Sequence, residues 1–262
     1  MLDVHPAHHA ASTWRDFFIH IATIVLGLLI AIGLEQTVEA IHHRHQLHQL
    51  EADLHTEGIR NLHITLDNIR GSEQRRQTDA QQYAELIQAV RDHRAAAALP
   101  AQNIIYSKPA YAVWTVAQQS RTLGLLSRED AQCYTRLYGV VQYAVDQVKD
   151  INTANDRRTV AMLTGVIDPA GFPALAQTGE RPRYDLSLLD TQDLREARNA
   201  IAADLLIARQ SIKWNVYLYG IEWSVLHGSR SDEQNLQTIY DAMDVYLNGG
   251  VPALLAIYPL PG

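Results

Sequence analysis

The sequence predicts an all-α protein in which an N-terminal transmembrane helix continues into an antiparallel helical bundle. Three observations lead to this prediction. Residues 17–34 are almost entirely apolar. Apolar residues then recur at three- and four-residue steps through the long segments that follow, which is the period of an amphipathic helix. The alternation of apolar and polar residues that marks a β-strand never lasts for more than a few positions.

The apolar run FFIHIATIVLGLLIAIGL, residues 17–34, has only His20 and Thr23 as polar side chains. As a helix it would be roughly 27 Å long, close to the ~30 Å thickness of the hydrocarbon core of a bilayer. A buried core helix would show a polar stripe, and a signal peptide would be cleaved near the small residues 31–33. The length of the run and the lack of a stripe favour an uncleaved span, preceded by an N-terminal tail at 1–16.

One face of this span predicts self-association. It carries small residues at four-residue steps, continued by a carboxylate: Thr23, Gly27, Ala31 and Glu35. Small residues at this spacing let two helix backbones approach closely in a bilayer, so we expect a homo-oligomer or a partner in a membrane complex.

The orientation of the span rests on few charges. Arg15 precedes it and Arg44 follows it, so the count of basic residues on the two sides is tied. A short tail before a long domain is typical of a signal anchor. We therefore expect a single-pass protein of the bacterial inner membrane with its main domain in the periplasm.

The bundle domain is expected at 35–247 and an apolar tail rich in Pro and Gly at 248–262. Within the domain the apolar spacing and the turn residues predict helices at about 35–71, 79–97, 111–123, 127–164, 190–226 and 231–247. Gly58 is a candidate kink in the first of these helices. Ser127 is a candidate N-cap, because acidic residues follow it in the first turn. The longest irregular segment is 168–189.

Two segments carry a resemblance to known proteins. Residues 14–45, WRDFFIHIATIVLGLLIAIGLEQTVEAIHHRH, have an aromatic–basic start, an apolar anchor, an acidic residue and a His-rich exit. Residues 111–142, YAVWTVAQQSRTLGLLSREDAQCYTRLYGVVQ, read as a helix, a small turn and a Tyr-containing helix. Both resemble segments of a group of uncharacterised bacterial single-pass membrane proteins. The resemblance implies an anchored helical domain and supplies no catalytic residues.

The histidines after the span raise the possibility of a metal site. Glu39, His42 and His45 stand at three-residue steps, and Glu39-Ala-Ile-His42 matches the Glu-x-x-His half-motif of di-iron bundles. A second half-motif is missing from the sequence, so only a dimer would complete such a site. Protonation of the cluster could also sense pH. The simplest interpretation is a solvated or headgroup-contacting collar.

Five aromatic residues could line a pocket for a small apolar or aromatic ligand: Trp114, Trp214, Tyr217, Tyr219 and Trp223. The alternative for these side chains is the filling of the helical core.

Other classes of function are disfavoured. The net charge of −7 argues against nucleic acid as a partner. Cys133 is the single cysteine, so an internal disulfide is excluded, and its acidic neighbours would raise the thiol pKa. Neither a nucleophile elbow nor a phosphate-binding loop is present. We expect a non-enzymatic accessory or scaffold subunit without a cofactor, with a ligand or pH sensor and a metal-binding protein as alternatives.

Overall fold

The computed structural model describes residues 14–94, 106–166 and 191–261, and within these ranges the chain is helical without a β-strand. The helices are α1 (Trp14–Arg91), α2 (Ala112–Gln119), the 3₁₀ helix η1 (Thr122–Leu125), α3 (Arg128–Val166), α5 (Thr191–Leu226) and α6 (Asp232–Ile257). The predicted all-α class is confirmed. The chain forms two compact units, residues 1–51 and 52–262, and α1 contributes to both.

Among the residues that the structure describes, one helix is long and apolar enough to cross a membrane: α1, whose apolar run lies in the first unit. Residues 17–34 form its apolar run, and none of the most apolar stretch is buried. Leu26 and Leu34, for example, are 59% and 64% exposed. Exposure of so many apolar side chains to water is unfavourable, so this run is stable only where lipid or another protein shields it.

The first half of the chain differs from the sequence prediction in one respect. We expected a break between Gly71 and Asp79, whereas α1 is one helix of 78 residues through both positions. Ser72 supports this continuity, because its hydroxyl donates to the Asn68 carbonyl oxygen one turn earlier. Gly58 is also helical, and a Cβ there would lie 2.9 Å from the Leu226 side chain. Its small size therefore permits close packing of α1 against α5.

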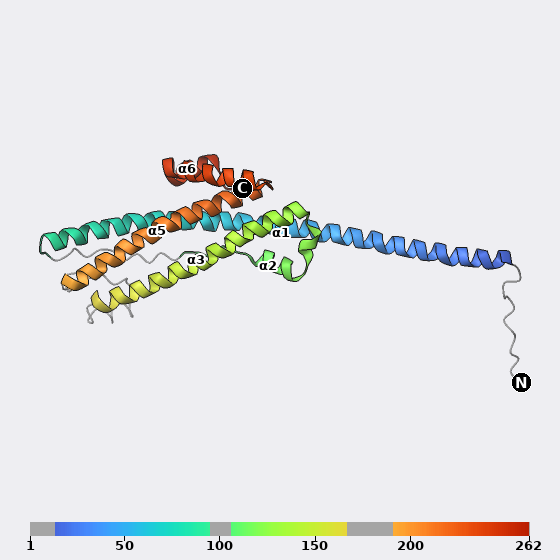
Figure 1. Ribbon diagram of the computed structural model, residues 1–262, viewed down its shortest axis with the longest axis horizontal. Helices are drawn as coiled ribbons and strands as arrows, with labels where there is room; N and C mark the ends of the chain where they lie inside the picture. The colour runs from blue at the N-terminus through green and yellow to red at the C-terminus, as the bar shows by residue number, and fades with distance from the viewer. Residues whose placement is uncertain (1–13, 95–105, 167–190, 262) are drawn as a thin grey trace, which may run out of the picture. The chain divides into compact units, whose positions relative to one another are not determined.

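Helices α1, α3 and α5 lie side by side in the second unit (Figure 1). Helix α5 runs opposite to α1, since Thr65 contacts Glu222 while Ser72 contacts Ser211. Helix α3 runs in the same direction as α1. The connection between them must therefore carry the chain back along α1. Residues 106–111 do so outside any helix or strand, and the hydrogen bonds described below indicate that 107–110 is extended.

The apolar core of the second unit is shared by α1, α5 and α6. It consists of Leu62, Leu66, Ile69, Ile212, Val216, Tyr219, Ala242, Tyr246, Val251, Leu254 and Tyr258. At roughly 1.5–3 kcal/mol for each large side chain removed from water, this cluster is the main favourable term for the fold. Helix α6 approaches α5 closely at Gly220, where a Cβ would lie 3.1 Å from the Ile239 Cα.

Beside this apolar core, α1 carries a second stripe that is buried and polar. We call it the polar seam; it consists of Glu57, Asn61, Thr65, Asn68, Ser72, Arg75, Asp79 and Gln82. Successive positions are three or four residues apart, so they lie along one face of the helix. Buried polar groups are costly unless they are hydrogen-bonded, and the contacts of the seam therefore constrain how its neighbours pack.

Two asparagines of the polar seam hold the extended segment through its backbone. The Asn68 side chain accepts from the Ser107 amide at 2.9 Å and donates to the Ser107 carbonyl at 2.8 Å. Asn61 makes the same pair of bonds with Ala110, at 2.7 and 2.9 Å. Seven residues of helix rise ~10.5 Å and three residues of extended chain span ~10 Å, so the two spacings match.

A third asparagine acts from the other side of the segment. The Asn152 side chain on α3 accepts from the Tyr106 amide at 3.2 Å and donates to its carbonyl at 3.1 Å. The segment thus receives from side-chain amides the kind of pairing that a neighbouring strand would supply.

The ends of the return connection are capped. Glu57 accepts from the Val113 amide at the start of α2 and from the Tyr138 hydroxyl of α3, at 2.9 and 2.7 Å. Ser127 accepts from the Asp130 amide at 3.0 Å, which confirms the predicted N-cap of α3.

The C-terminal residues also differ from the prediction. We expected a helix ending near Leu247 and an apolar tail at 248–262, but α6 continues to Ile257 through a kink at Gly250, whose φ is 65°. This part packs on the bundle. The Tyr219 hydroxyl donates to the Tyr258 carbonyl at 2.7 Å, and the Trp223 indole donates to the Pro259 carbonyl at 3.0 Å.

Replacement of Asn68 by Ala should lower the free energy of unfolding by about 2 kcal/mol, because two part-buried backbone groups lose their partners. Denaturant unfolding of the full chain in detergent, followed by tryptophan fluorescence, measures the change. Asn248→Ala is the matched control, since Asn248 is exposed and bonds only within its own helix. Equal effects of the two substitutions would show that the segment is not held by Asn68.

Candidate functional site

The residues considered for a metal site lie on the exposed part of α1 in the first unit. Glu39, His42 and His45 are all exposed, and the nearest imidazole to the Glu39 carboxylate is that of His43, with 3.8 Å between Oε1 and Nε2. Among the described residues, no group of three His, Cys, Asp or Glu side chains is placed to hold a metal ion. A single copy of the chain therefore does not bring the three predicted ligands together.

The predicted association face is exposed as well. Open space surrounds the position of a Cβ on Gly27. The Thr23 hydroxyl donates to the Ile19 carbonyl at 2.8 Å, so it already has a partner within its own helix. Ala31 and Glu35 continue the same exposed face. The geometry leaves room for a second helix but shows no side chain that requires one.

The five aromatic residues proposed for a pocket divide among three places. Trp114 is buried and stacks on Tyr138, with 5.0 Å between ring centroids and 4° between planes. Tyr219 and Trp223 hold the C-terminal end of the chain through the two hydrogen bonds described above. Only Trp214 and Tyr217 line a cavity together.

This aromatic cavity has a volume of about 550 Å³. Helices α3, α5 and α6 enclose it with Cys133, Arg136, Gly139, Val140, Tyr143, Trp214, Tyr217, Ile221, Asp232, Asn235, Leu236 and Ile239. The Trp214 ring lies 5.0 Å from that of Tyr143 and 5.8 Å from that of Tyr217. Arg136 and Asp232 form an ion pair of 2.7 Å on its lining. The volume is in the range that holds a small molecule or a large side chain of a partner.

Cys133 lines the same cavity, but its chemistry is that of a buried thiol. Burial raises the pKa of the thiol, and the nearby Arg230 opposes this only in part. The sulfur lies 3.6 Å from the Ser229 carbonyl oxygen, to which the thiol donates. A thiol that stays protonated is a poor nucleophile.

A surface stripe on α6 was not anticipated from the sequence. Leu236, Tyr240 and Leu247 are 47%, 67% and 68% exposed, and Met243 lies between them and is partly buried. Their steps of four, three and four residues place them on one face, as in the seam of a coiled coil. We call these four residues the α6 stripe. The signal was present in the sequence, but this helix has a second apolar face that packs inward, at Ile239, Ala242 and Tyr246, and the two patterns overlap.

Glu222 was also missed as an interior residue. It lies on α5 and is 1% exposed, and the Thr65 hydroxyl donates to its Oε2 at 3.3 Å. Its Oε1 has no hydrogen-bond partner among the described residues. Burial raises the pKa of this carboxyl well above its usual value, and hydrogen bonds from Thr65 and Asn61 oppose the shift. Burial therefore favours the neutral form of this carboxyl.

No family model, no curated protein and no solved structure matches this chain.

Replacement of Glu222 by Gln should stabilise the protein increasingly as the pH rises. Above about pH 4.5 the unfolded chain releases the proton that the folded state retains, so the free energy of unfolding falls by up to ~1.4 kcal/mol per pH unit until the raised pKa is reached. Glutamine removes this dependence and keeps the shape. Unfolding in denaturant at pH 5, 6 and 7 measures the difference between the two proteins; a difference independent of pH would contradict the buried neutral carboxyl.

Proposed function

We propose that this protein is a non-enzymatic, membrane-anchored helical protein that acts as an accessory or scaffold subunit by binding another protein. The observation that carries the proposal is the α6 stripe, an exposed apolar surface beside the aromatic cavity. The same chain contains a candidate membrane-spanning segment. Exposed apolar surface of this kind is typical of protein interaction sites.

The membrane anchor is supported by the exposed apolar run at 17–34, which a bilayer would cover. Trp14, 76% exposed, precedes it at the position where aromatic rings favour the headgroup region. The proposed location is the bacterial inner membrane, with the helical domain in the periplasm.

A non-enzymatic role is supported by the use that the fold makes of its buried ionisable groups. Glu57 caps α2 and binds Tyr138. Arg75 pairs with Asp79 and with Asp204, at 3.5 and 3.1 Å. Glu57 and Arg75 each join α1 to another segment of the bundle, as a structural role requires.

The partner surface that fits the α6 stripe is an amphipathic helix with basic residues beside its apolar face. The charged residues of α6 are all acidic: Asp232, Glu233, Asp241 and Asp244. Glu233, Asp241 and Asp244 are exposed next to the stripe, whereas Asp232 is paired with Arg136. A second copy of α6 would bring the same negative charges, so charge complementarity favours a different protein over self-association.

A second candidate function is the binding of a small apolar or aromatic ligand in the aromatic cavity, for which Trp214, Tyr217 and Tyr143 supply the walls. An added ligand would then raise the melting temperature and quench the Trp214 fluorescence, whereas a protein partner would be recovered at fixed stoichiometry.

The double substitution Leu236→Glu/Tyr240→Glu should abolish recovery of a stoichiometric partner when the intact protein is purified in mild detergent and analysed by mass spectrometry. The change introduces charge into the stripe without touching the core. Carbodiimide cross-linking should join Glu233, Asp241 or Asp244 of the wild-type protein to lysines of that partner.

Val116→Glu is the control, because Val116 is 62% exposed and lies on α2, outside the stripe. Recovery of only a homo-oligomer, unchanged by the double substitution, would contradict the proposal. Stoichiometric iron or zinc in the same sample would redirect attention to Glu39, His42 and His45.

A further inference from the structure

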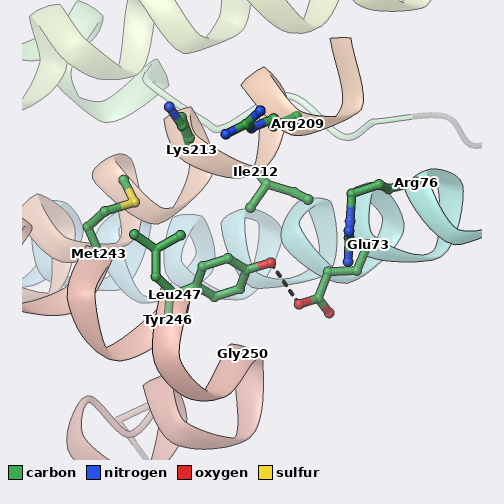
Figure 2. Close-up of a pocket in the computed structure, with 9 residues that line it drawn as sticks. All are labelled: Glu73, Arg76, Arg209, Ile212, Lys213, Met243, Tyr246, Leu247 and Gly250. Carbon is green, nitrogen blue, oxygen red and sulfur yellow. Dashed lines mark hydrogen bonds between the residues drawn. The ribbon is translucent and has the colours of Figure 1, made fainter. Parts of the chain in front are cut away.

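A second cavity of the helical domain is lined by cationic side chains. It has a volume of about 410 Å³ and lies among α1, α5 and α6. Arg76 comes from α1, and Arg209 and Lys213 come from successive turns of α5 (Figure 2). We call it the basic cavity. In a chain with a net charge of −7, three cations around one cavity are a local reversal of charge.

None of these three cations forms an ion pair with another residue that the structure describes. All three side chains are exposed, and the ion pairs of the described residues involve other arginines: Arg70, Arg75, Arg94, Arg136 and Arg230. Like charges brought together repel each other, and the repulsion is relieved when an anion binds between them.

The single carboxylate on the cavity lining is held by a different group. Glu73 Oε1 accepts from the Tyr246 hydroxyl at 2.7 Å, as Figure 2 shows. Burial and this hydrogen bond raise the pKa of Tyr246, so its hydroxyl remains protonated and continues to donate. With three cations against one engaged carboxylate, the cavity favours an anion with more than one negative charge.

Three aliphatic or thioether side chains complete the lining. Ile212 lies on α5 beside the cations, and Figure 2 shows Met243 and Leu247 projecting from α6 below Lys213 and Arg209. The positive φ of Gly250, 65°, marks the kink of α6 at this cavity. An occupant would therefore meet both cations and apolar side chains.

We propose that the basic cavity binds a phosphate monoester that carries an apolar group. The doubly charged oxyanion would lie between Arg76, Arg209 and Lys213, since guanidinium groups bind phosphate oxygens in a bidentate manner. The apolar substituent would cover Ile212, Met243 and Leu247. A soluble organic phosphate and the headgroup region of a phosphatidate lipid share this chemistry. Met243 and Leu247 also belong to the α6 stripe, so a docked partner and this ligand would contact the same two side chains, whereas the three cations belong to the basic cavity alone.

The first test uses the full chain in a non-ionic detergent and hexyl phosphate as the ligand, with calorimetry as the readout. Hexyl phosphate should bind, while hexanol and hexyltrimethylammonium, which share its apolar group, should not. Arg209→Gln/Lys213→Gln should weaken binding by at least about tenfold, because two of the charge-assisted contacts are lost. Lys149→Gln, at an exposed position of α3, should leave affinity within about twofold.

The second arm identifies the source of the ligand. The protein is reconstituted in phosphatidylcholine nanodiscs with and without phosphatidate, and hexyl phosphate is titrated into both. If hexyl phosphate binds more weakly in the nanodiscs that contain phosphatidate, the lipid competes for the cavity and is its ligand. Equal affinity in both kinds of nanodisc would assign the cavity to a soluble phosphate. Absence of hexyl phosphate binding, equal binding of hexanol, or unchanged affinity in the double variant would overturn the proposal.

Discussion

The arrangement of the helical domain depends on the pairing of side-chain amides with an extended backbone. Asn61 and Asn68 stand two turns apart on α1, and this spacing equals that of Ala110 and Ser107 on the returning segment. A shift of either element by one residue would leave these buried polar groups unpaired. The pairing therefore fixes where the segment lies, and with it the start of α2 and the position of α3.

The rest of the polar seam extends this constraint to α5. Ser72 contacts Ser211, Thr65 contacts Glu222, and Arg75 contacts Asp204. Polar contacts in a helical interface contribute less to stability than apolar ones, but in some proteins they select one register among several. A domain with a fixed register presents a constant outer surface, which both the α6 stripe and the basic cavity require.

The sequence was sufficient for the helical class, the apolar span, the Ser127 cap and the beginnings of α5 and α6, because each depends on local patterns. It was insufficient for features that depend on contacts between residues far apart in the sequence. Gly71 is typical of a helix end in the sequence, but in the fold the helix continues, and Ser72 contacts Ser211 on α5. The seven-residue repeat from Asn61 to Asn68 is visible in the sequence, but its partner is an extended segment that no periodicity identifies. The basic cavity joins α1 to α5, and their side chains become neighbours only in the fold.

Hydrogen exchange at the amides of Ser107 and Ala110 tests the central constraint most directly. These amides lie in a connection without helix, where exposed backbone exchanges rapidly. If the asparagines hold the segment, its peptides should exchange as slowly as the buried parts of α1 and α5 in the full chain in detergent, and Asn68→Ala should accelerate exchange at Ser107. Rapid exchange in the wild-type protein would contradict the role assigned to the polar seam.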